Sequence, residues 1–318
     1  MDNKLAYVAT VLSVAGILLY LKHTIDSSGG QLRGGRGLAK SAPAADPFIN
    51  TQAVSQQDCK LELLPPHLAT AEGASKPADY VLTTAVGYTP YQTRAFLKTF
   101  RRHNQEARIV VLVAPDQWLA TRNPFCAYGR HYGVEFHSLE PSQYYPVVLL
   151  RFLAYQEMLD SLRPGSVRNI LLADMRDTLF QGDPFSPEVL PAPQTAAARP
   201  GAELPYVLFS EEGDLTTRVT IRSQPANLEW GIDQGIHNFI VHYLKPHRPD
   251  LLKFEALQLP NDDSPIYTVG LIEPPRIDVS DDGFAVYNSK GVQPPIIHQG
   301  DRQAKLNNYM DVISADGI

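Results

Sequence analysis

Two carboxylates and a guanidinium follow directly on an apolar run in the segment NILLADMRD. The run 169–173 is typical of a buried strand, and Asp174, Arg176 and Asp177 come right after it. Burying an unpaired charge costs free energy, so charged groups in such a place need a counter-charge or a metal ion. Carboxylate oxygens at a strand end are typical ligands of Mg²⁺ or Mn²⁺. The alternative is a solvated strand end in which Arg176 forms a salt bridge.

A histidine near the end of the chain can complete such a ligand set. His298 follows an apolar strand-like run and precedes Gln299, Gly300 and Asp301. Its ring nitrogen, together with oxygens from the two acids, would hold a divalent cation beside a diphosphate, whose charge that cation neutralises. For His298 taken alone, a structural role is the competing interpretation.

The elements around these residues alternate between strands and helices. We expect strands at 80–87, 107–115, 133–139 and 169–174, helices at 91–104 and 147–162, then a strand at 206–213, a helix at 231–244 and short strands at 266–270, 284–288 and 294–300. The alternation predicts an α/β fold with right-handed crossovers, and the wholly apolar run 107–115 favours a parallel sheet covered on both faces. Ligands bind at the carboxyl ends of strands in such sheets, so the acids after 169–173 would line a cleft.

The N-terminal part predicts a membrane anchor followed by a stem. Residues 5–21 carry no charge and, at about 17 residues, are near the lower limit for crossing a bilayer. No small-x-small cleavage site follows, so we favour an uncleaved signal-anchor over a cleaved signal peptide. Residues 1–4 would be a cytoplasmic tail, 22–78 a flexible stem rich in small and polar residues, and 79–318 the folded domain. This predicts a single-pass type II membrane protein whose folded domain lies in the Golgi or another secretory lumen.

The composition argues against several classes of protein. The 318 residues carry a net charge of −6 without a long Lys/Arg run, which argues against a nucleic-acid binder. Cys59 and Cys126 are too few for a metal cluster, and they form one bridge in an oxidising lumen or remain buried thiols. No Walker motif, GxSxG elbow or HExxH is present, and no GxGxxG follows a strand. A phosphatase with Asp174 as nucleophile would need an acid at Arg176.

Three motifs together resemble nucleotide-diphospho-sugar glycosyltransferases of the GT-A fold, particularly the glycogenin-like retaining enzymes. They are the strand end at 174–177, the DQGIHN segment with Asp233, Gln234 and Asn238, and the late HQG with His298. The D-x-R-D…F-Q-x-D-P-F form is also similar to a subgroup of uncharacterised, membrane-anchored sugar transferases of plants, algae and their viruses. The resemblance covers about residues 79–308 and implies a GT-A-like, Rossmann-type mixed sheet, mostly parallel and flanked by helices.

The resemblance also implies roles at a donor site. The family's first strand-end acid touches the ribose and the metal, and its last acid binds the metal, which gives those roles to Asp174 and Asp177. His298 would be the third ligand of Mn²⁺ or Mg²⁺, although Gly300 comes one residue early for the family motif. Arg176 takes the place of the family's second acid, and as a fixed cation on the diphosphate it would leave little need for a metal. Lys305 would supply the basic group of the C-terminal motif.

Further donor-binding candidates come from the first strand and from the helix before the motif. Thr83, Thr84 and Tyr88 match the family's contacts to the base and ribose, with Tyr88 stacking on a uracil or guanine. The alternative for Tyr88 is a plain surface aromatic. Arg151 matches a basic residue that reaches the donor, or it packs its stem along the helix surface.

Asp233 and Gln234 are the catalytic candidates that the resemblance implies. Asp233 would lie beside the transferred sugar, where it binds hydroxyls or stabilises oxocarbenium charge, or it would simply cap the helix that begins there. The Ser/Asn-x-Gly segment that lines the acceptor side in the family is missing between residues 212 and 233.

The function implied is transfer of a hexosyl or pentosyl group from a nucleotide-diphosphate donor to a glycan or protein acceptor, assisted by a divalent metal and with retention of configuration. A different class is a membrane-tethered binding module, a degenerate transferase fold that holds sugar or nucleotide without turnover. The missing acceptor segment and Arg176 favour the module. The retained acids Asp174, Asp177 and Asp233, together with His298, favour the enzyme.

Overall fold

The computed structural model describes residues 61, 77–142, 146–162, 166–189, 261–269, 276–280 and 283–315, and the backbone at 206–210 and 255–259. The predicted anchor, nearly all of the predicted stem, and the predicted helix with Asp233 and Gln234 lie outside this part of the chain. Among the helices described, none combines the length and the apolar character that crossing a bilayer requires.

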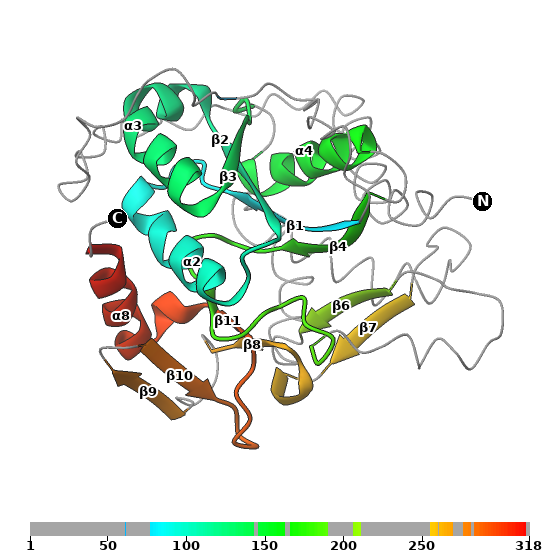
Figure 1. Cartoon of the computed structure of the whole chain (residues 1–318), viewed down its shortest axis with the longest axis vertical. Helices are drawn as coiled ribbons and strands as arrows, with labels where there is room; N and C mark the ends of the chain where they lie inside the picture. The colour runs from blue at the N-terminus through cyan, green and yellow to red at the C-terminus, as the bar shows by residue number, and fades with distance from the viewer. Residues whose placement is uncertain are drawn as a thin grey trace, which may run out of the picture.

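A parallel sheet with the strand order β3-β2-β1-β4 forms the centre of the fold (Figure 1). Its strands are β1 (Ala78–Thr84), β2 (Arg108–Val113), β3 (Val134–Ser138) and β4 (Val167–Leu172). All three neighbouring pairs run parallel. The chain moves outward from β1 to β3 and then returns to the other side of β1 as β4. The order therefore reverses between β1 and β4, which is where open α/β sheets bind their ligands.

Helices cover both faces of this sheet. Helices α2 (Pro90–His103) and α3 (Pro115–Tyr132) lie on one face, and α4 (Val147–Ser161) lies on the other. Strand β2 is buried on both sides, because Ile109, Val111 and Val113 belong to the α2/α3 side, whereas Val110 and Leu112 belong to the α4 side. This accounts for the wholly apolar run. The predicted mostly parallel α/β sheet flanked by helices is confirmed.

Local sequence signals explain how these helices begin and end. Helix α2 starts with a capping box in which Thr89 and Gln92 satisfy each other's backbone N–H groups. Helix α3, which the sequence did not predict, departs from helical geometry at Thr121 and contains Pro124, which cannot donate a backbone hydrogen bond. It ends at Gly133, whose φ of 61° is the left-handed conformation common after helices.

A second layer lies below the parallel sheet in Figure 1 and packs against α2. It contains the three-stranded sheet β5-β11-β8, a hairpin, a parallel strand pair, two 3₁₀ turns and the last helix. Their bounds are β5 (Leu179–Phe180), β6 (Tyr206–Ser210), β7 (Glu255–Leu259), η5 (Asn261–Asp263), β8 (Ile266–Thr268), β9 (Arg276–Ser280), β10 (Gly283–Tyr287), β11 (Ile296–His298), η6 (Gly300–Arg302) and α8 (Ala304–Ala315).

Helix α2 holds α8 in place through hydrogen bonds to its C-terminal carbonyls. The hydroxyl of Tyr91 donates to the carbonyl of Asp311, and the buried guanidinium of Arg94 donates to the carbonyl of Ser314, both at 2.8 Å. A cation at the C-terminus of a helix also interacts favourably with the helix dipole. Because α8 directly follows η6 and β11, these bonds help to fix the segment that carries His298.

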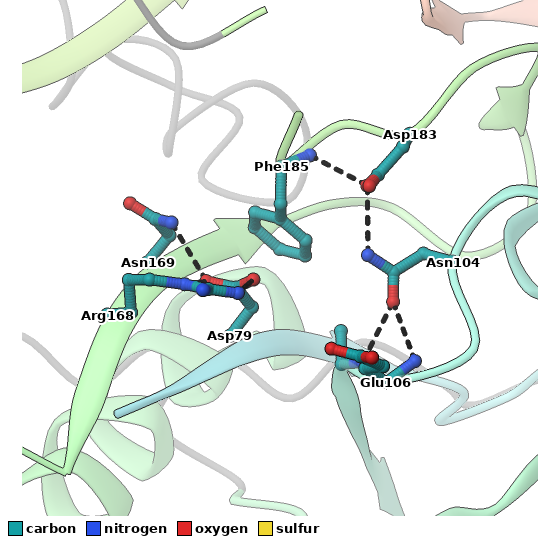
Figure 2. A network of polar contacts seen from close by, with 8 residues as sticks. Asp79, Asn104, Glu106, Arg168, Asn169, Asp183 and Phe185 are labelled. Atoms are coloured by element: carbon teal, nitrogen blue, oxygen red, sulfur yellow. Dashed lines mark hydrogen bonds and ion pairs between the residues drawn. The ribbon is translucent and has the colours of Figure 1, made fainter. Parts of the chain in front are cut away.

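A polar network joins the amino ends of β1 and β4 and the turn between α2 and β2 (Figure 2). Buried Asp79 accepts hydrogen bonds from Arg168 at 2.9 Å and from Asn169 at 2.8 Å. Asn104 donates to Asp183 at 2.9 Å, and its carbonyl oxygen accepts the backbone N–H groups of residues 106 and 107. Asp79 is thus neutralised by Arg168, and Asp183 is held by a neutral amide, so the network serves to join these segments.

We expect Asn104→Ala to lower the free energy of unfolding by about 1–3 kcal/mol, because two backbone N–H groups and Asp183 each lose a partner. Urea denaturation followed by circular dichroism measures this change. The exposed neighbour Glu106 is the control, since Glu106→Ala keeps its backbone bond to Asn104 and should stay within about 0.5 kcal/mol of the parent. Equal stability of the two variants would contradict a structural role for this network.

Candidate functional site

The predicted site residues from β1 and β4 meet at the carboxyl edge of the sheet. Leu82 pairs with Leu172, so two residues further on Thr84 and Asp174 leave the sheet at the same level. The Thr83 hydroxyl donates to the carbonyl of Ala173 at 2.8 Å, and this bond joins the two strand ends. Thr84 donates to the carbonyl of Leu112 on β2 at 3.4 Å. Both threonines are buried and hold the edge together, and their direct contact with a donor stays a prediction.

Asp174 lies between an aromatic and a basic group from two other segments. Its carboxylate accepts a hydrogen bond from the Tyr88 hydroxyl at 3.2 Å and lies 3.7 Å from the Arg151 guanidinium of α4. It also accepts the backbone N–H of Arg176 at 3.3 Å. Burial, and then the negative charge of Asp174, raise the pKa of Tyr88 well above its usual range, so this phenol remains a hydrogen-bond donor. The structure therefore brings together Tyr88, Arg151 and Asp174, as the sequence predicted.

Asp177 is largely buried and lacks the partners that a buried carboxylate needs. Its Oδ1 atom is shielded from solvent without a hydrogen bond and lies 3.9 Å from Nε2 of His298. The pKa of Asp177 is raised to about 6, chiefly by burial and also by the charges of Asp174 and Asp301. His298 and Arg176 oppose this shift. Desolvation prevails because a contact of 3.9 Å with a partly exposed imidazole compensates poorly for lost water.

His298 reaches Asp177 because two strands from distant parts of the chain are paired. Strand β11 lies antiparallel to β5 and parallel to β8, with His298 opposite Thr268. Nδ1 of His298 lies 3.4 Å from the Thr268 hydroxyl, which orients the ring. The backbone N–H of Gly300 donates to the carbonyl of Asp177 at 2.9 Å and fixes the two segments next to each other. The predicted proximity of Asp177 and His298 is thereby present in the fold.

The turn after His298 has an unusual backbone. Gln299 has a φ of 60°, and it is the one residue other than glycine with a positive φ in the part of the chain that the structure describes. Its side chain is buried, and its Oε1 atom has no hydrogen-bond partner. Such backbone conformations cost about 1–3 kcal/mol and occur preferentially at functional sites.

Arg176 forms a salt bridge, as the alternative interpretation of the strand end expected, with Asp301, a partner that the sequence did not predict. The guanidinium donates to Oδ2 of Asp301 at 2.8 Å, while Oδ1 of Asp301 is buried without a hydrogen bond. The Arg176 side chain is 49% exposed, so one face of this cation remains open to solvent. The available signal was the QGD sequence after His298, which places an acid three residues beyond the predicted metal ligand.

The predicted metal set of Asp174, Asp177 and His298 is only partly assembled. Within the described ranges, no group of three or more His, Cys, Asp or Glu side chains is arranged to hold a metal ion. Asp177 and His298 suit one cation, because a buried carboxylate oxygen without a partner faces a ring nitrogen. Asp174 is already bound by Tyr88 and Arg176. Its ligation of a metal stays a prediction.

Three further predictions remain untested by this geometry. The amine of Lys305, in the first turn of α8, donates to the carbonyl of Ile277 on β9 at 3.2 Å, so its contact with a donor stays a prediction. Asp233 and Gln234 lie outside the described residues. The same is true of residues 212–233, where the sequence has no acceptor motif. Comparison of the sequence with models of known protein families and with curated proteins finds no match.

We expect Asp177→Asn to stabilise the protein above pH 6 by about 1–3 kcal/mol when metals are chelated. The raised pKa means that the folded state favours the protonated carboxyl. Burial of the ionised carboxylate therefore costs the parent no stability below about pH 4. Above the folded pKa of about 6 it costs the full amount. Thermal unfolding of both proteins between pH 4 and 8, with a chelator present, measures the difference. A gain that is equal at pH 4 and pH 8 would contradict this explanation.

Proposed function

We propose that this chain is a glycosyltransferase of the GT-A type, which transfers a sugar from a nucleoside diphosphate to a glycan or protein acceptor. The observation that carries the proposal is the gathering of Asp174, Asp177 and His298, with Arg151 and Arg176, at the point where the strand order reverses. Arg151 lies against Asp174, Arg176 pairs with Asp301, and His298 lies against Asp177. Arginine side chains together with metal-binding groups are suited to bind a diphosphate.

The geometry suggests how the parts of the donor would be distributed. The loop with Tyr88 would receive the base, and Asp174 would accept hydrogen bonds from the ribose hydroxyls. Arg176 would turn its exposed face to the diphosphate. Asp177 and His298 would hold Mn²⁺ or Mg²⁺, which supplies positive charge to the departing nucleoside diphosphate when it is bound. Asp233 and Gln234 are proposed to act on the transferred sugar.

The ion pair of Arg176 with Asp301 gives the cation two states. Paired with Asp301, the guanidinium is neutralised at the sheet edge. A bound diphosphate offers the same planar fork a doubly charged partner, and arginine binds such groups in a bidentate manner. The ligand would therefore compete with Asp301 for Arg176.

The location that we propose is a secretory lumen, with residues 5–21 as a signal-anchor in the Golgi membrane. Buried Cys126 is disulfide-bonded, and disulfides persist mainly in oxidising compartments. This supports an oxidising environment for the folded domain.

A second candidate is a tethered module that binds nucleotide or sugar without turnover. It is favoured by the way in which Asp174 and Arg176 are already engaged by protein groups. The two candidates share the donor site and differ in whether bound donor is consumed.

Full-length protein in detergent should be stabilised by UDP or GDP in the presence of Mn²⁺. A ligand at one hundred times its Kd adds about 2.7 kcal/mol to the free energy of unfolding. Thermal-shift titrations with several nucleoside diphosphates, with and without Mn²⁺, measure the effect. No stabilisation by any of them would refute the donor site. Binding without release of nucleoside diphosphate from any nucleotide-sugar would favour the module over the enzyme.

Arg176→Lys should weaken metal-free binding of the nucleoside diphosphate by about 3- to 30-fold, since lysine keeps the charge opposite Asp301 but loses the planar fork. Isothermal titration with the diphosphate and with the plain nucleoside separates the phosphate contact from the base contact. Arg168→Lys is the matched control, because that guanidinium lies at the amino edge against Asp79. If both variants bind as the parent does, Arg176 does not contact the diphosphate.

A further inference from the structure

Gln117 of α3 binds the backbone of the loop that carries Tyr88 at three points. The Oε1 atom of Gln117 accepts the backbone N–H of Gly87 at 2.9 Å. Its Nε2 atom donates to the backbone carbonyl of Ala85 at 2.8 Å and to that of Tyr88. One amide thus satisfies three backbone groups of a four-residue loop, and it uses both its acceptor and its donor to do so.

The loop itself is a tight turn with glycine at its exposed position. The N–H of Tyr88 donates to the carbonyl of Ala85 at 2.9 Å, and Gly87 has a φ of 81°, as the third residue of a type II turn requires. A Cβ atom added at Gly87 would meet nothing within 4 Å. Val86 packs against the core on the α4 side, whereas Gly87 is exposed, so polar bonds are what hold the second half of the turn.

This turn determines where the Tyr88 ring lies. The backbone of Tyr88 is the last of the groups that Gln117 binds, and its hydroxyl reaches Asp174 at 3.2 Å. Gln117 is the third residue of α3, which begins directly after β2, so it stands at the same carboxyl edge as β1. The Gln117 amide is therefore connected to Asp174 through the backbone and the ring of Tyr88.

We infer that Gln117 is a positioning residue for the nucleoside half of the donor, acting through the turn at 85–88 and the ring of Tyr88. The inference rests on the proposed function and identifies which part of the ligand this loop recognises. The diphosphate would be bound by Arg176 and the Asp177–His298 pair, which Gln117 does not contact. Loosening the turn should therefore weaken binding of the base and leave binding of the phosphates intact.

Glutamate is the sharpest replacement because it has the same shape as glutamine. In Gln117→Glu the carboxylate still accepts from Gly87 but cannot donate to the carbonyls of Ala85 and Tyr88, which it would repel. Ala120→Glu is the matched control, because it adds the same charge at an exposed position of the same helix. Gln117→Met, which is similar in size and lacks both hydrogen-bonding groups, tests the result without a charge.

We expect Gln117→Glu to weaken binding of UDP or GDP by about 5- to 50-fold, with binding of inorganic pyrophosphate within about twofold of the parent. Both ligands are titrated into the full-length protein with Mn²⁺. The melting temperature of the free protein should change no more than in the Ala120→Glu control. In a Tyr88→Ala background, Gln117→Glu should have little further effect, since residues that act through one another are not additive.

Each result has a distinct meaning. A parent protein that binds no nucleoside diphosphate overturns the proposed function and this inference with it. A parent that binds, together with a Gln117→Glu variant that binds equally well, overturns the inference alone. The inference alone is also overturned if Gln117→Glu weakens pyrophosphate binding as much as nucleotide binding. It is likewise overturned if Gln117→Glu lowers nucleotide affinity by the same factor in the Tyr88→Ala background. If Gln117→Glu fails to fold, the same criteria apply to Gln117→Met.

Discussion

The pairing of β4 with β1, rather than with β3, is the constraint on which the rest of this structure depends. It brings the end of the fourth strand next to the end of the first, and the Thr83 hydroxyl closes the two ends against each other. Backbone pairing thus sets the distance between the Tyr88 loop and Asp174. Strand β4 is the outer strand of this sheet, and without β1 as its neighbour the charged residues after it would have no aromatic loop opposite them.

The site contains charges of both signs that are incompletely compensated by their neighbours. Asp174 lies between Tyr88 and Arg151, whereas the largely buried Asp177 has the ring of His298 at 3.9 Å. Groups this poorly compensated lower the stability of a fold, and they persist where a bound ligand can complete them. The positive φ of Gln299 lies one residue from His298 and adds a backbone cost at the same place.

Periodicity in the sequence was sufficient for the parallel sheet and for two of its helices. The apolar runs gave β1 to β4 within a few residues; β1, β2 and β3 are mostly buried, whereas β4, expected to be a buried strand, is an edge strand that is only partly buried. Helix α3 was missed since Pro124 and the break at Thr121 obscure its period. Strand β5 has only two residues, and β9 is largely exposed, so neither leaves a clear pattern.

The candidate site could be predicted only where a motif lies next to a strand end. Asp174, Asp177 and His298 were identified in this way, and the fold places the last two together. Asp301 and Gln117 depend on tertiary contacts that a linear pattern does not carry. Gln117 in particular binds backbone groups, and a glutamine in the first turn of an unrecognised helix gives no sign of that role.

The pairing of β11 between β5 and β8 has a consequence for the order of synthesis. Strand β5 and Asp177 leave the ribosome long before His298, so the central strand of this small sheet arrives last and must insert between two older neighbours. Until then Asp177 lacks both the imidazole and the N–H of Gly300 that fixes its backbone. The nascent chain would therefore hold a hydrated, mobile acid at that position, and burial of its charge becomes one of the final events of maturation.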